Sequence, residues 1–173
     1  GTGYIKTIFS PQNNIAARNL SGFDLNANYT LETDIGEWRI NLDTTLMSKF
    51  EVQDTSDTPF RDIVGTYDPA FGSLPEYKAN IQLDWSMGNY RATWDANYNS
   101  EIEAAEDDIM SAATFHNMQV GYFIEGIGTD MHFGIQNVFD KKPPYLQANI
   151  TSTDDNLYSF RGRFFYMGVK KEF

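Results

Sequence analysis

The residues best suited to metal chemistry are two histidines, His116 and His132. They fall on different predicted strands, and the alternation of side chains along each strand puts them on opposite faces. Two such imidazoles cannot share one metal ion. The chain has no cysteine, so it has no thiolate ligand or thiol nucleophile. No nucleophile is paired with a base. The sequence therefore predicts no catalytic site, no metal site and no cofactor, and we do not expect an enzyme.

An acidic run at 101–108 is the nearest approach to a site for a hard cation. It contains Glu101, Glu103, Glu106, Asp107 and Asp108. Carboxylate oxygens are the ligands that Ca²⁺ prefers. The run lacks the spacing of a known calcium loop, and a solvated outer loop explains it more simply. Whether it binds a cation stays open.

A second candidate lies in the segment 53–76, where aromatic rings stand among charged residues. Aromatic rings with a few polar groups are typical of small-molecule sites. The predicted ligand contacts, for a sugar or a siderophore, are Phe60, Arg61, Tyr67 and Phe71. The same rings could instead pack a long loop against itself.

The elements that position these residues are predicted to be long β-strands. Apolar and polar residues alternate at 22–32, 38–52, 77–86 and 90–99. Such alternation gives a strand one apolar and one polar face. In 38–52, Phe50 and Val52 are predicted to continue the apolar face of Leu42. Further strands are predicted at 113–125, 130–139 and 159–173, with a partial strand at 4–9, so about seven strands are long.

Strand and loop lengths point to a membrane. A tilted transmembrane strand needs ~9–11 residues, whereas soluble strands average about 5–6. Tight connections at 34–36, 86–89 and 126–129 alternate with long ones at 53–76, 103–112 and 140–158. Short periplasmic turns and long extracellular loops are typical of outer-membrane barrels. The predicted fold is all-β, an antiparallel transmembrane β-barrel segment, with Trp38, Trp85 and Tyr90 at one membrane interface. A soluble sandwich or a lipocalin-like barrel would also alternate, but with shorter strands or an apolar interior.

Composition excludes two other classes of protein. The net charge is −11 at pH 7. A nucleic-acid-binding surface needs basic residues, and so does peripheral attachment to anionic lipid. The mean hydropathy of −0.46 gives no hint of a membrane, but barrel strands dilute each apolar residue with a polar one.

Several short motifs resemble those of TonB-dependent outer-membrane receptors. The segment 137–144, NVFDKKPP, is similar to the family's N-hydrophobic-F-D-K-x-P motif after the penultimate strand. Residues 74–75 resemble the LP that opens a strand, and 21–25 resemble an xGxEL strand. Residues 158–163 resemble the opening of the final strand. Phe173 resembles the family's C-terminal aromatic residue. Together the motifs span residues 20–173 and follow one another in the family's order.

The resemblance implies that 1–173 is the C-terminal portion of a barrel of about 22 strands. The plug and the earlier strands would lie upstream. It also implies a barrel-assembly signal on the last strand: Phe165, Met167, Val169 and Phe173. In this signal, Lys171 stands where an apolar residue is usual.

The function implied is TonB-dependent uptake of an extracellular siderophore, carbohydrate or similar nutrient across the outer membrane of a Gram-negative bacterium. The implied partners are the plug, the TonB energy-coupling complex, the barrel-assembly machinery, and outer-membrane lipid and lipopolysaccharide. The alternative is a small stand-alone barrel with a pore, adhesion or structural role, which is physically possible at this size.

Overall fold

A computed structural model describes residues 17–105 and 108–171. The partial strand predicted at 4–9 and the terminal Phe173 lie outside these residues. The part described is all-β, with a single short 3₁₀ turn, η1 (Glu125–Ile127). Seven long strands form the sheet: β1 (Ala17–Thr33), β2 (Gly36–Gln53), β6 (Tyr77–Met87), β7 (Tyr90–Asn99), β10 (Ala113–Ile124), β11 (Thr129–Gln136) and β12 (Phe164–Lys171).

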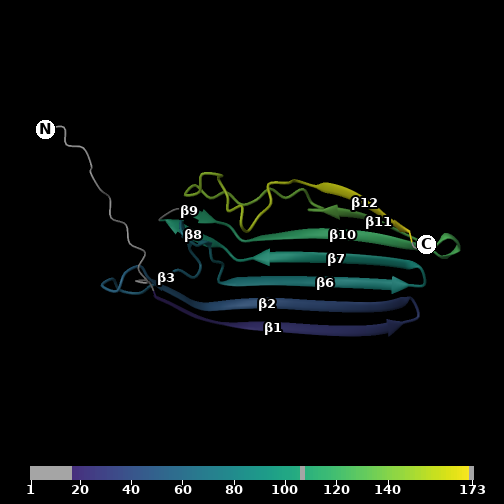
Figure 1. The fold of residues 1–173 in the computed structure, drawn as a ribbon, viewed down its shortest axis with the longest axis horizontal. Coiled ribbons are helices and arrows are strands. Elements are labelled where there is room, and N and C mark those ends of the chain that lie inside the picture. The colour runs from purple at the N-terminus through teal and green to yellow at the C-terminus, as the bar shows by residue number, and fades with distance from the viewer. Residues whose placement is uncertain (1–16, 106–107, 172–173) are drawn as a thin grey trace, which may run out of the picture.

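The long strands pair in chain order, each antiparallel to its neighbours, in one curved sheet (Figure 1). Short β3 (Arg61–Asp62) pairs with the end of β2. The sheet does not close on itself, because β1 and β12 form its two edges. The predicted fold class is thus confirmed as an antiparallel sheet of long strands, consistent with part of a barrel. Among the described residues, no helix has the length and apolarity needed to cross a membrane.

The strand register aligns one apolar row across the whole sheet. Residues opposite each other on paired strands share a face. The row consists of Tyr29, Ile40, Leu83, Trp94, Met118, Ile135 and Phe165. We call this side the apolar face. A matching row defines the polar face: Thr30, Arg39, Asp84, Thr93, Gln119, Gly134 and Tyr166. The predicted alternation is confirmed for these strands.

A β-bulge at Ser48 corrects one prediction. Ser21 pairs with Lys49 while Gly22 pairs with Met47, so Ser48 is the extra residue on β2. One extra residue exchanges the two faces of the strand beyond it. Phe50 and Val52 were predicted on the apolar face, and this prediction is wrong. They lie on the opposite side of the sheet, where Val52 is buried.

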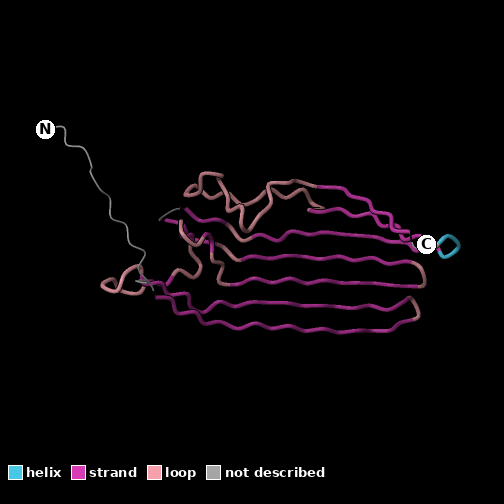
Figure 2. Tube along the Cα trace, in the orientation of Figure 1, coloured by secondary structure: helices cyan, strands magenta, loops and turns pink. Residues whose placement is uncertain are grey.

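The tight connections all lie at one end of the strands and the long ones at the other (Figures 1 and 2). Gly36 and Gly88 adopt positive φ angles of 113° and 55°, which side chains rarely allow. Beside these turns Trp38 pairs with Trp85, at 6.2 Å between ring centroids. The Trp85 Nε1–H donates to the Ile35 carbonyl at 2.7 Å. Trp38 and Trp85 therefore lie beside the tight turns, as predicted, and so does Tyr90 at the start of β7.

Three strand boundaries differ from the prediction. The first strand begins at Ala17 instead of residue 22. The last strand begins at Phe164 instead of residue 159. β11 ends at Gln136, because the next residue, Asn137, has a φ of 52° that ends an extended strand. Residues 137–163 consequently form one long connection.

The three long connections fold together into a compact unit, which we call the loop cap: 54–76, the described part of 100–112, and 137–163. It contains short hairpins, β4 (Tyr67–Asp68) with β5 (Gly72–Ser73), and β8 (Ile102–Ala105) with β9 (Asp108–Met110). Its buried core joins the second and third connections to the start of β10: Ile102, Met110, Ala113, Leu146 and Tyr158. The predicted loops are thus structured.

Candidate ligand-binding site

Backbone hydrogen bonds connect the three segments of the loop cap. The Glu103 N–H donates to the Gly65 carbonyl at 2.8 Å, beside a parallel bridge between Thr66 and Glu103. The N–H groups of Gln147 and Ala148 donate to the Asp108 carboxylate at 3.1 and 2.9 Å. Two acidic residues of the run 101–108 therefore have structural contacts within the cap.

Asp154 joins the first and third segments. Its side chain is fully buried. The Ser73 N–H donates to its carboxylate at 2.6 Å, and the Asn156 N–H does so at 2.9 Å. Burial alone would raise the pKa of Asp154, but the hydrogen bonds from Ser73 and Asn156 outweigh it and lower the pKa. The buried group is therefore a carboxylate at neutral pH.

The four predicted ligand contacts do not converge. Arg61 pairs with Asp68 at 2.6 Å and with Asp54 at 3.2 Å. Tyr67 packs against the core of the loop cap. Phe71 lies 5.7 Å from the ring of Phe50 and beneath the Arg18 guanidinium, whose carbon is 4.6 Å from the ring centroid. Phe60 is exposed.

None of these four residues lines the cavity described next. Three of them have packing or ion-pair contacts within the loop cap and sheet. Their role as ligand contacts stays a prediction.

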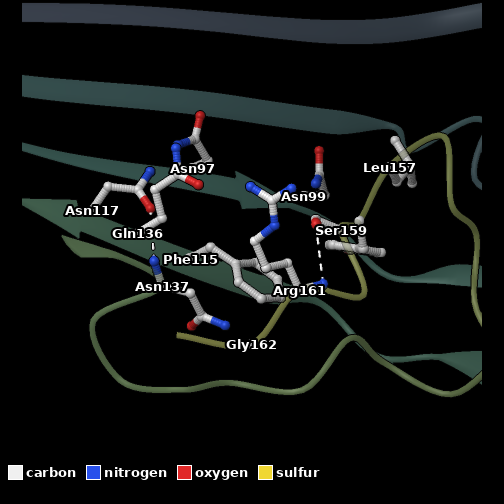
Figure 3. A pocket seen from close by; sticks show the side chains of 11 residues that line it. Asn97, Asn99, Phe115, Asn117, Gln136, Asn137, Leu157, Ser159, Arg161 and Gly162 are labelled. Atoms are coloured by element: carbon white, nitrogen blue, oxygen red, sulfur yellow. Dashed lines mark hydrogen bonds between the residues drawn. The ribbon is translucent and has the colours of Figure 1, made fainter. Parts of the chain in front are cut away.

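A cavity of about 230 Å³ lies where the loop cap meets the polar face. Its walls come from the cap-side ends of β7, β10 and β11 and from the segment 157–162 (Figure 3). Eleven residues line it: Asn97, Asn99, Phe115, Asn117, Gln136, Asn137, Leu157, Tyr158, Ser159, Arg161 and Gly162. Five carry amides and one carries a guanidinium, and none is acidic.

Several of the amides are held in place by their neighbours. Asn97 and Asn117 both donate to the Asp95 carboxylate at 2.8 Å. The Asn117 side-chain oxygen accepts from the Asn137 N–H at 2.9 Å. The cavity wall is therefore preorganised by hydrogen bonds on the polar face.

Arg161 supplies the charge of the cavity. Its guanidinium carbon lies 4.7 Å from the centroid of the Phe164 ring. It forms no ion pair within the described part of the chain. In Figure 3 the guanidinium is directed into the cavity, towards Asn97 and Asn99.

Away from the cavity, the polar face carries a hydrogen-bonded lattice of charged and amide groups. Asp84 accepts from the Thr93 hydroxyl at 2.7 Å. Arg91 pairs with Asp130 at 2.5 Å. Gly121 allows this pair, because a Cβ at that position would lie 2.9 Å from an Arg91 nitrogen. These charged groups of the polar face thus have hydrogen-bond or ion-pair partners on nearby strands, as expected for a surface that faces a hydrated barrel interior.

The two histidines lie on opposite faces, as predicted. His116 is on the apolar face and stacks on Trp94, with ring centroids 5.7 Å apart. His132 pairs with Gly121 on the polar face and lies 4.0 Å from an Asp130 oxygen. The two residues are thus separated by the sheet.

The predicted assembly residues occupy the apolar face of the edge strand β12. Phe165, Met167 and Val169 expose 54%, 71% and 58% of their surface. Their pairing partners Ile135, Phe133 and Met131 are apolar as well. The role of these residues in assembly stays a prediction.

Neither a known protein family nor a curated protein matches the chain. A solved structure that does match is a mutant of the ferric enterobactin receptor from Pseudomonas aeruginosa, with a TM-score of 0.52 over 89% of this chain. The two sequences are 18% identical. The chain spans 22% of the length of that receptor. At this identity the likeness shows a shared fold.

Proposed function

We propose that this chain is part of an outer-membrane receptor that takes up an extracellular ligand through a TonB-dependent, energy-driven mechanism, and that it has no catalytic role. The observation that carries the proposal is the exposed apolar face, which runs across all seven long strands opposite a hydrogen-bonded polar face. A face of this extent needs a cover of lipid.

The limits of the apolar face match a bilayer. β6 and β7 are 11 and 10 residues long, and a transmembrane strand needs ~9–11. The tryptophan pair lies at one boundary. At the other, beyond the bulge at Ser48, Lys49 and Glu51 pair with polar Ser21 and Asn19 on the outward side. The loop cap would then lie outside the cell.

The two free edges support a larger barrel. β1 is exposed along all 17 of its residues. Unpaired backbone groups are not tolerated in lipid. An odd number of long strands lies between β1 and β12 in the antiparallel sheet, so β1 and β12 run in the same direction. They therefore cannot pair with each other as antiparallel strands and close the sheet. We propose that further strands complete the barrel around a plug. The proposed partners are the TonB complex, the barrel-assembly machinery, outer-membrane lipid and lipopolysaccharide.

The experiment is a gene deletion in the native host. The mutant is grown on a panel of single carbon sources and iron chelates, beside a strain that lacks TonB. Uptake predicts a growth defect confined to one or a few nutrients and reproduced by the loss of TonB. A stand-alone pore predicts a general change in permeability that does not depend on TonB. Normal growth on every nutrient would contradict the uptake proposal, provided that the protein is detected in the wild-type outer membrane.

A further inference from the structure

We propose that the amide-lined cavity binds a ligand group in which a carboxylate is flanked by hydroxyl groups, with Arg161 holding the carboxylate. The inference rests on the proposed function and names the chemical class of the ligand. Two sources share this chemistry, an acidic sugar and an iron chelate of a hydroxycarboxylic acid.

The first argument is the charge of the cavity. The whole chain has 24 acidic and 13 basic residues, yet the cavity wall contains a guanidinium and no carboxylate. A cation in a wall that holds no carboxylate attracts an anion. The Asp95 carboxylate accepts hydrogen bonds from Asn97 and Asn117 and does not itself line the cavity.

The second argument is the orientation of Arg161. The guanidinium carbon of Arg161 lies over the Phe164 ring, 4.7 Å from its centroid, and this contact occupies none of the N–H donors with a hydrogen bond. The N–H groups point outward in the guanidinium plane, and two of them can grip one carboxylate in a bidentate pair. Figure 3 shows this group entering the cavity from the 157–162 side, opposite the amides of β7.

The third argument is the set of amides around the guanidinium. An amide offers both donors and an acceptor, as a hydroxyl group does, so the two pair in either direction. Asn99 and Gln136 line the cavity on different strands, β7 and β11. The half-buried Phe115 provides an apolar surface between them. This arrangement suits a hydroxylated group with one apolar side.

The size of the cavity limits what it holds. Its volume of about 230 Å³ is below the ~300–1,000 Å³ of pockets that enclose a drug-sized ligand. It therefore accommodates a group about as large as one sugar ring, which can be the end of a longer ligand.

The test measures binding by the purified full-length protein in detergent. The probes are digalacturonate, cellobiose as the neutral sugar, and ferric citrate. We expect binding of digalacturonate or ferric citrate, and the probe that binds identifies the source. The variant Arg161→Gln should weaken binding of that probe about 10- to 100-fold, the usual effect of losing a charge-assisted hydrogen bond. Asn99→Asp, which places a negative charge in the wall, should weaken it as well.

The matched control is Arg163→Gln. It removes the same charge two residues further along the chain, and the Arg163 side chain does not line the cavity. It should leave binding unchanged, and heat-dependent electrophoretic mobility should confirm that all variants are folded. The inference is overturned if neither anionic probe binds, if cellobiose binds equally well, or if both arginine variants weaken binding alike. Binding without TonB-dependent uptake would reject the proposed function alone. TonB-dependent uptake of another ligand, without binding of either anionic probe, would reject this inference alone.

Discussion

Asp154 connects the first and third segments of the loop cap. Its buried carboxylate accepts hydrogen bonds from Ser73 and Asn156. Asp154→Asn removes the charge from these bonds and should destabilise the cap by about 1–3 kcal/mol. We expect faster proteolytic cleavage within 137–163 in the full-length protein. Asp155→Asn, at the exposed neighbouring position, is the control and should cleave at the wild-type rate.

The lowered pKa of Asp154 also predicts a pH dependence of cap stability. Hydrogen bonding outweighs burial, so the folded pKa lies below the unfolded value of about 3.9. The contribution is fully present above the unfolded pKa and is lost as pH falls through the folded pKa. Cleavage by pepsin should rise steeply below about pH 4 in the wild type and less steeply in Asp154→Asn. Identical pH profiles would contradict this assignment.

Leu42 and Asn41 test the two faces at adjacent positions. Leu42 lies on the apolar face and pairs with Ile81. Arginine there should reduce the free energy of unfolding in lipid vesicles by ~2–4 kcal/mol. Arginine at Asn41 should cost far less, because that side chain lies 3.4 Å from the Asp84 carboxylate. Urea titration of both variants measures the difference, and equal losses would remove the basis for a lipid-facing side.

At the scale of the element, the bulge at Ser48 decides which side chains face the loop cap. Inserting one serine between Ser21 and Gly22 provides a partner for Ser48 and restores a regular ladder. The faces of both strands beyond this point would then exchange. Val52 would lose its burial and Phe50 its contact with Phe71. We expect the half-life of the loop cap towards protease to shorten several-fold.

The control for this insertion is deletion of Ser48. It also removes the bulge, but Lys49 still pairs with Ser21 and Phe50 with Leu20. Both faces are then preserved, so protease resistance should stay near the wild-type value. If the deletion opened the cap as much as the insertion does, the bulge itself would matter and the orientation of Phe50 would not.

At the scale of the whole molecule, the sheet separates two ends with different surroundings. Because the chain contains no cysteine, an introduced thiol is unique within it. Asp57→Cys, in the loop cap, should react with a membrane-impermeant maleimide on intact cells. Asp34→Cys, in the turn between β1 and β2, should react only after the outer membrane is permeabilised. The reverse labelling pattern would mean that the topology is inverted and that the cavity faces the periplasm.

The alternating faces could be predicted from the sequence because a period of two is a property of the local backbone. Ile40 and Leu42 share a face of β2, and Ile81 and Leu83 share a face of β6, whatever the rest of the chain does. The tight turns could be predicted for the same reason, since Gly36 and Gly88 supply positive φ angles locally.

Only the tertiary structure determined the orientation of Phe50 and the position of the cavity. The bulge at Ser48 depends on how β1 pairs with β2, so no periodicity within β2 alone reveals it. The cavity depends on residues from β7 and on Arg161, more than sixty positions later in the chain. They meet because 137–163 folds back over the polar face. Such long-range packing reflects summed contacts and the closure of long loops, which local sequence patterns do not encode.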